Sequence, residues 1–214
     1  MNLTTVRYKE SAMETKETIL KKALDMFAKS GYDSVSIRDI AKAVNIKESS
    51  IYYHFKNKQA IFDELLHRFE QVATDMMVRL EQSLSVQSCS MEKPFYQTVS
   101  DTFFENYFMD HFCNKIMRLL LIEQFGNSEV QKIYDYWMFE KPLEFQSKVF
   151  YTLMKIGILP KTDSQYLAVK YYAPIYFFAH RWLFSGELSE EQKNSFQNAA
   201  YHHIEKFFAE MEAA

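Results

Sequence analysis

The chain has 214 residues, of which 48% are hydrophobic and 25% are charged, a balance typical of a folded globular protein. Only 4 Gly and 4 Pro leave few turns, which favours long helices over a many-stranded sheet, and no apolar run is long enough to predict a membrane-spanning helix. The net charge of −3 is unevenly distributed, because residues 1–60 hold 11 Lys and Arg against 7 Asp and Glu, whereas residues 61–214 hold 14 against 21. A basic N-terminal part on an acidic body indicates that the N-terminal part contacts a polyanion.

The first strong helical pattern begins near Ile19. Residues 1–14 carry no such pattern and no apolar stretch of a secretory signal, and we expect them to form an N-terminal arm. Gly31 is expected to end the first helix. The apolar stripe of the first helix, with a period of 3.6 residues, consists of Ile19, Leu20, Ala23, Leu24, Phe27 and Ala28.

The two cysteines, Cys89 and Cys113, lack metal-type spacing and are expected to be reduced thiols.

Two short helices are expected next, joined by a tight turn. Ser36 and Asp39 form a variant of the capping box at the start of the second helix. The turn places Asn45 where the backbone enters the left-handed region, which Gly usually occupies and Asn tolerates well. A short third helix begins near Lys47. The angle between the two helices is filled by Ile40, Ala41, Val44, Ile46 and Ile51.

A long fourth helix is predicted to follow, capped by Asn57. Residues 83–93 show a weaker helical pattern and are expected to connect the fourth helix to the rest of the body. Pro94 suits the first turn of the next helix. The buried face of the fourth helix is predicted to carry Ile61, Phe62, Leu65, Leu66, Phe69, Val72, Ala73, Met76, Met77 and Leu80.

The rest of the chain is also helical in pattern, so the predicted fold class is all-α, with about nine helices. A second capping box begins at Ser189, and Pro174 is expected to interrupt the hydrogen bonding of a helix. Three domains are predicted: an N-terminal arm over 1–14, a three-helix helix-turn-helix domain over 15–60, and a helical domain over 61–214, to which the resemblance described below assigns effector binding and dimerisation. The helical segments of this last part are expected at 95–108, 112–124, 128–156, 163–185 and 189–211.

Residues 19–65 resemble the DNA-binding domain of the TetR/AcrR family of bacterial transcriptional regulators. The resemblance rests on Phe27, Gly31-Tyr32, Ile40-Ala41, the run from Ile51 to Phe55, and Lys58. It implies a cytoplasmic bacterial protein, associated with the nucleoid when bound to its double-stranded DNA operator, that is not an enzyme and needs no cofactor. The default activity of this family is repression, and activation stays an alternative.

The resemblance implies a role for most of the polar residues in this region. Ser36 and Arg38 are expected to contact the DNA backbone, and Tyr52 and Lys58 to contact phosphates. Phe55 matches a core position. The role of Lys47 is open, although it also faces outward on the third helix. The residues expected to face the base edges in the major groove are Ser49, Ser50, Tyr53 and His54.

The resemblance weakens after about Leu66 but returns in the segment from Ala173 to Glu191. In the family this region forms a homodimer interface, and the candidates here are Phe177, Phe184, Phe196, Ala200, Ile204 and Phe207. Aromatic residues crowd the body and indicate a pocket for a small hydrophobic or aromatic effector, although plain core packing is the better explanation of any single one of them. The pocket candidates are Phe103, Tyr107, Met117, Tyr134, Trp137, Phe145, Tyr172 and Tyr176.

Two other interpretations remain open. Glu64 and His67 form a Glu-x-x-His pair of the kind found in metal-binding helical bundles and enzymes, but the sequence contains no second such pair. A DNA-binding protein of the same family that uses no small-molecule effector is the other alternative. Several polar residues are embedded in apolar segments of the body, where they could orient a ligand or serve as paired helix ends: His111, Arg118, Glu123, His180 and Arg181.

Overall fold

The computed structural model describes residues 3–85 and 95–212, with side chains described for 12–82 and 99–211. These residues form nine helical rods and no strand, which confirms the predicted all-α fold. No helix in these ranges combines the length and the apolar character that crossing a bilayer requires. The rods are α1 (Leu3–Ser30), α2 (Ile37–Val44), α3 (Glu48–His54), α4 (Lys58–Ser85), α5 (Phe95–Phe103) with η1 (Phe104–Phe108), α6 (His111–Glu123), α7 (Ser128–Asp135) with η2 (Tyr136–Glu140) and α8 (Lys141–Lys155), α9 (Ser164–Phe178) with η3 (Ala179–Leu183), and α10 (Glu190–Glu212).

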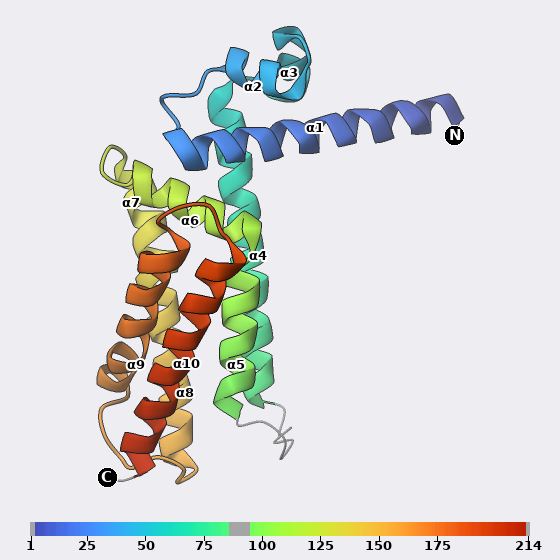
Figure 1. Cartoon of the computed structure of the whole chain (residues 1–214). Coiled ribbons are helices and arrows are strands. Elements are labelled where there is room, and N and C mark those ends of the chain that lie inside the picture. The colour runs from blue at the N-terminus through green and yellow to red at the C-terminus, as the bar shows by residue number, and fades with distance from the viewer. Residues whose placement is uncertain (1–2, 86–94, 213–214) are drawn as a thin grey trace.

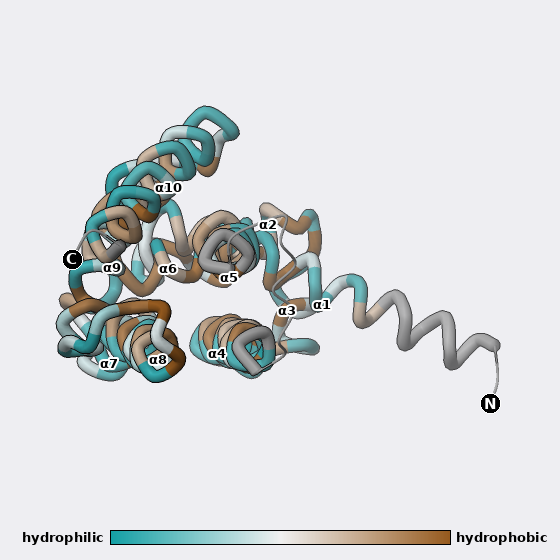
Figure 2. Tube along the Cα trace, turned by 90° about the horizontal axis from the view of Figure 1, so that it is seen from below, coloured by the Kyte–Doolittle hydropathy of each residue, from teal (hydrophilic) through white to brown (hydrophobic). Residues whose placement is uncertain are grey.

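The helices form a small N-terminal unit at one end of a larger bundle (Figure 1). Helices α1, α2 and α3 make up the small unit, and α4 leaves it and runs down into the bundle. Helix α6 lies across the top of the bundle and packs directly against α1. Seen from below, the helices of the bundle stand side by side around a common interior (Figure 2). The N-terminal unit is therefore held by the body at two places, α4 and α6.

Helix α1 is longer than the sequence pattern indicates. It begins at Leu3, so residues 3–14 are its first turns and not a separate arm. No Gly or Pro occurs before Gly31, and this stretch contains good helix formers, so nothing stops the helix from extending towards the N-terminus. Gly31 ends the helix as predicted, with a φ of +81°. Pro94 lies outside the described residues.

The fourth helix follows its prediction closely. The side chain of Asn57 accepts a hydrogen bond from the N–H of Ala60 at 2.9 Å and caps α4. Nine of the ten residues predicted for its buried face are buried, but the prediction for Val72 is wrong, because its side chain is 40% exposed. The buried stripe runs through Phe69, Ala73 and Met76, and Val72 lies at the edge of that stripe.

Three of the rods contain π-helical turns, namely η1, η2 and η3. A π turn inserts one extra residue and breaks the regular i to i+4 hydrogen bonding, so it is rare and leaves main-chain carbonyls to be satisfied in another way. The periodicity of the sequence predicts continuous helices through all three segments and gives no sign of the insertions. The extra residues occur where the most crowded part of the aromatic core is packed, around Tyr107, Trp137 and Ala179.

Buried polar side chains tie these turns together. The hydroxyl of Tyr107 in η1 donates to the carbonyl of Trp137 in η2 at 2.9 Å, and the hydroxyl of Tyr172 donates to the carbonyl of Met138 at 2.7 Å. The amide of Asn114, which is only 1% exposed, donates to the carbonyls of Phe108 at 3.1 Å and Leu183 at 3.0 Å, the last residues of η1 and η3. The π turns are therefore compensated by side-chain donors from neighbouring helices.

Replacing Tyr107 by Phe should destabilise the protein by about 1–3 kcal/mol, because the carbonyl of Trp137 then stays buried without this donor. The measurement is urea unfolding followed by circular dichroism. Tyr151→Phe is the matched control, since the Tyr151 side chain is 62% exposed and the same atom is removed from a solvated position. Equal unfolding free energies for the two variants would contradict the role assigned to the Tyr107 hydroxyl.

Candidate nucleic-acid interface

The start of α2 is fixed by a reciprocal capping box. The hydroxyl of Ser36 accepts from the N–H of Asp39 at 3.2 Å, and the carboxylate of Asp39 accepts from the N–H of Ser36 at 3.0 Å and from its hydroxyl at 2.5 Å. These hydrogen bonds from Ser36 lower the pKa of Asp39 below its usual value. The cap predicted from the sequence is confirmed, and it sets the direction in which the helix-turn-helix begins.

The turn between α2 and α3 depends on Asn45. Its backbone has φ 60° and ψ 45°, and it is the only non-glycine residue with a positive φ among the described residues. The N–H of Ile46 then donates to the carbonyl of Ala41 at 3.0 Å, which brings the chain back towards α2. The left-handed turn that the sequence predicts at Asn45 is therefore present.

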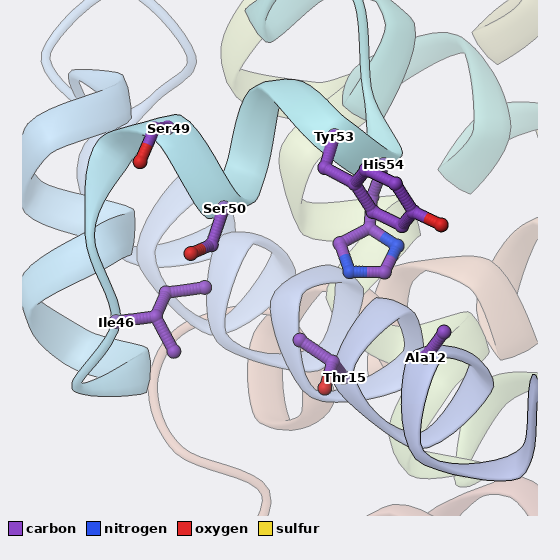
Figure 3. A pocket seen from close by; sticks show the side chains of 7 residues that line it. All are labelled: Ala12, Thr15, Ile46, Ser49, Ser50, Tyr53 and His54. Atoms are coloured by element: carbon purple, nitrogen blue, oxygen red, sulfur yellow. The ribbon is translucent and has the colours of Figure 1, made fainter. Parts of the chain in front are cut away.

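Helix α3 presents a polar face over a groove that α1 closes from the other side (Figure 3). The groove has a volume of about 440 Å³. Its α1 wall consists of Ala12 and Thr15, neither of which the sequence analysis singled out. The other wall contains Ile46 and the four residues expected to meet base edges, Ser49, Ser50, Tyr53 and His54.

Tyr53 and His54 form the end of this face. The Tyr53 side chain is 67% exposed, and its ring meets the His54 ring edge to face at a centroid distance of 5.0 Å. Burial, and then the nearby charge of Lys16, lower the pKa of His54 below its usual value, so the imidazole is neutral at pH 7. A neutral imidazole can both donate and accept a hydrogen bond at a base edge.

Lys58 is placed differently from the other predicted contacts. Its ammonium donates to the carbonyl of Tyr32 at 2.8 Å and lies 4.0 Å from the centroid of the Tyr32 ring. Tyr32 directly follows the end of α1, where free carbonyls attract a cation. A phosphate contact by Lys58 therefore competes with this internal pairing. Arg38, Lys47 and Tyr52 are exposed, in line with contacts to DNA.

Residues 19–65 match the family model described as "Bacterial regulatory proteins, tetR family". This part of the chain is therefore similar to the N-terminal domain of that family. Over 49 residues it is 45% identical to the biofilm operon icaADBC negative transcriptional regulator IcaR of Staphylococcus aureus. That match covers 23% of this chain and 26% of the relative, so the chain spans about a quarter of the length of the curated relative that it matches.

The TetR-type domain is joined to a body whose fold also has solved counterparts. A Mesorhizobium loti protein described as a TetR-family transcriptional regulator is 20% identical, with a TM-score of 0.65 over 92% of this chain and 96% of that one. The complex of triclosan with SmeT, a Stenotrophomonas maltophilia repressor, is 18% identical, with a TM-score of 0.64 over 90% of this chain and 91% of the other. At these identities the likeness establishes the fold of the body.

The structure brings the eight pocket candidates of the body into one aromatic core. Phe103 contacts Tyr107 and Tyr172 through ring centroids at 5.2 Å and 6.4 Å. Tyr134 and Tyr176 share a short hydrogen bond between their hydroxyls. Trp137 and Phe145 line an open cleft between α4 and α8, a space of about 220 Å³.

The six dimer candidates divide into two groups. Phe177 on α9 is 56% exposed. The others lie inside the core of a single chain, because α9 packs against α8 and ring contacts join α9 to α5 and α10 to η1 and α8: Phe184, Phe196, Ala200, Ile204 and Phe207. These five residues hold α9, η3 and α10 in place within one chain.

The Glu-x-x-His pair on α4 has partners within the chain. The carboxylate of Glu64 pairs with the ammonium of Lys16 at 3.1 Å and with the guanidinium of Arg68 at 3.0 Å. The imidazole of His67 shares a hydrogen bond with the side-chain amide of Gln71. Arg68 also forms two hydrogen bonds to Glu17 on α1, at 2.6 Å and 2.8 Å. Glu64 therefore joins α4 to the N-terminal domain, and no group of three metal-ligating side chains occurs within the described part of the chain.

Tyr53→Ala should lose specific DNA binding while the fold stays intact, because the exposed ring of Tyr53 lies on the face that would enter the major groove. The expected loss is about 1–3 kcal/mol on the preferred site, with little change on random DNA, as measured by fluorescence anisotropy at fixed salt. Tyr151→Ala removes an equally exposed ring from the body and should bind as the wild type does. Unchanged specific affinity of Tyr53→Ala would rule out this contact.

Proposed function

We propose that the protein is a ligand-responsive transcriptional regulator, a repressor that binds a palindromic operator as a homodimer. The observation that carries this proposal is the exposed polar face of α3 in a TetR-type domain. The capping box at Ser36 and the left-handed turn at Asn45 hold that face in position. IcaR is named as a negative regulator, which favours repression over activation. Occlusion of a promoter by a bound dimer is the simplest way in which such a protein acts.

The exposed side of α9 supports the homodimer. Tyr166, Val169, Ala173 and Phe177 recur at spacings of three or four residues, so they lie along one face of the helix, and all four are exposed. An apolar stripe on an otherwise polar surface is typical of a face that a second protein covers. A two-fold axis at this stripe would pair it with itself and set the two α3 helices to read adjacent major grooves, about 34 Å apart.

DNA selected from a random pool by the full-length protein should contain two inverted half-sites. Phe177→Asp should convert the dimer into monomers, because the charge would be buried in the apolar stripe, and it should weaken binding to the paired site more than tenfold, on the order of 1.4 kcal/mol or more. Sedimentation equilibrium gives the mass, and mobility shift gives the affinity.

Tyr151→Asp places the same charge on an exposed position of α8 and should remain dimeric. If the DNA selected from the random pool shares no common motif, sequence-specific DNA recognition by α3 is refuted. A dimeric Phe177→Asp protein would refute the α9 interface and leave the DNA-binding proposal intact.

We further propose that the effector enters through the cleft between α4 and α8. Met77, Trp137 and Phe145 give this cleft an apolar floor that continues into the aromatic core. Its rim is charged, because Lys141 and Lys148 both hydrogen-bond to the carboxylate of Glu144 and lower its pKa to about 2. An apolar floor with a charged rim fits a small aromatic or hydrophobic molecule. The solved complex of SmeT, which is similar in fold, with triclosan supports a ligand of this kind.

The effector would act on DNA binding through α4 and α6. A ligand wedged between α4 and α8 favours a different tilt of α4, which runs from the cleft to the N-terminal domain. It can shift the equilibrium only by its differential affinity for the two arrangements. Release from DNA follows when the favoured arrangement no longer fits both half-sites.

A thermal-shift panel of hydrophobic amines and aromatic acids tests this proposal. The chain has 2 Trp, so Trp182→Phe leaves Trp137 as the only tryptophan reporter. An effector at 100 times its Kd should stabilise the protein by about 2.7 kcal/mol, change the emission of Trp137 and release the operator. A compound that stabilises the protein and releases DNA without changing that emission would place the effector site elsewhere. Stabilisation without release of DNA by every compound that binds would favour a regulator without an effector.

A further inference from the structure

A second cleft lies at the junction of the DNA-binding domain and the body. It is formed by the end of α1, the first half of α6 and the segment that connects η3 to α10, and its volume is about 860 Å³. This volume lies within the range of small-molecule sites. The cleft is separate from the one between α4 and α8, with which it shares no lining residue. Part of its wall is apolar, formed by Met26, Ala28 and Leu188.

Basic side chains from both halves of the molecule line this cleft. Lys29 comes from α1, and Lys115 and Arg118 come from α6. Two carboxylates are also present. That of Asp25 is paired with the ammonium of Lys115 at 2.5 Å. Glu187 acts on Arg118 electrostatically, but the two form no ion pair among the described residues.

Arg118 is the most informative of these groups. Its guanidinium is half-buried, and burial lowers its pKa, yet an arginine stays charged at neutral pH. It has five N–H donors in a planar fork that matches a carboxylate or a phosphate, and no carboxylate of the described chain lies within ion-pair distance. A partly desolvated cation without a counter-ion gains more from an added anion than a fully hydrated one does.

We propose that this junction cleft binds an amphipathic anion, a small molecule with a carboxylate or phosphate head and an apolar tail. The head bridges Arg118 on the body and Lys29 on the DNA-binding domain, and the tail lies against Met26 and Leu188. Because its two contacts belong to different halves of the molecule, the bound anion fixes α1 relative to α6. The site is additional to the effector cleft of the proposed function and does not depend on it.

Isothermal titration calorimetry of the full chain with octyl phosphate and with octanoate, at constant ionic strength, tests the proposal. The wild type should bind at least one of the two anions, and the stronger one identifies the head group, whereas 1-octanol should not bind measurably. Arg118→Gln and Lys29→Gln should each weaken binding about tenfold or more, since each removes one charged partner. Lys115 is left in place because its loss would also free Asp25.

Two matched variants separate the site from a general effect of charge. Lys22→Gln removes an exposed lysine from α1 outside the cleft, and Arg181→Gln removes an exposed arginine elsewhere on the body. Both should bind the anion as the wild type does, and melting curves of all four variants report on folding. Absence of binding by the wild type, or equal affinity for the wild type and Arg118→Gln, would overturn the proposal. A loss in Arg118→Gln alone would overturn the bridge to α1.

Discussion

Helix α4 is one uninterrupted rod that supplies core residues to both halves of the protein, and this constraint governs how they can move. Phe62 meets Tyr32 in the DNA-binding domain at a ring distance of 4.9 Å, and two turns later Phe69 meets Tyr107 and Trp137 in the body, both at 6.0 Å. Its 28 residues span about 42 Å at 1.5 Å per residue. Because one core runs along the rod, a tilt of α4 in the body would also displace the N-terminal unit.

Helix α6 provides the second connection, and the two together determine where α3 lies. Lys115 pairs with Asp25 in the last two turns of α1, and the carboxylate of Glu123 accepts from the N–H of Tyr32 at 2.8 Å just beyond its end. The closeness of the Glu123 carboxylate explains why position 31 is Gly, since an added Cβ would lie 3.0 Å from the Glu123 oxygen. The positive φ at Gly31 would also strain any other residue. Helix α1 is thus held to the body along its C-terminal half, while Ala12 and Thr15, which line the α3 groove, lie in its N-terminal half, which extends away from the bundle (Figure 1).

The features that the sequence predicted well are those that local chemistry decides. The cap at Ser36, the left-handed turn at Asn45 and the buried stripe of α4 each follow from a side chain and its near neighbours along the chain. Three kinds of feature could not be predicted. The start of α1 lacks a stop signal, the π turns arise from crowding between distant helices, and the inward pairing of Lys58 depends on where the carbonyl of Tyr32 is placed by the fold. The contact residues of α3 stay predictions because their partner is not a part of the chain.

The aromatic core limits how a ligand can open the body. The hydroxyls of Tyr107 and Tyr172 are already used by the carbonyls of η2, so a ligand that displaces either one leaves a buried carbonyl unpaired, at a cost of about 1–3 kcal/mol unless it brings a donor of its own. Trp137 and Phe145 present ring carbon to the cleft between α4 and α8 and require no such exchange. Entry from that side therefore costs least, and it acts on the same stretch of α4 that passes on the tilt. Under the proposed function, the polar compensation of this π turn favours entry between α4 and α8 and makes α4 the helix that an effector moves.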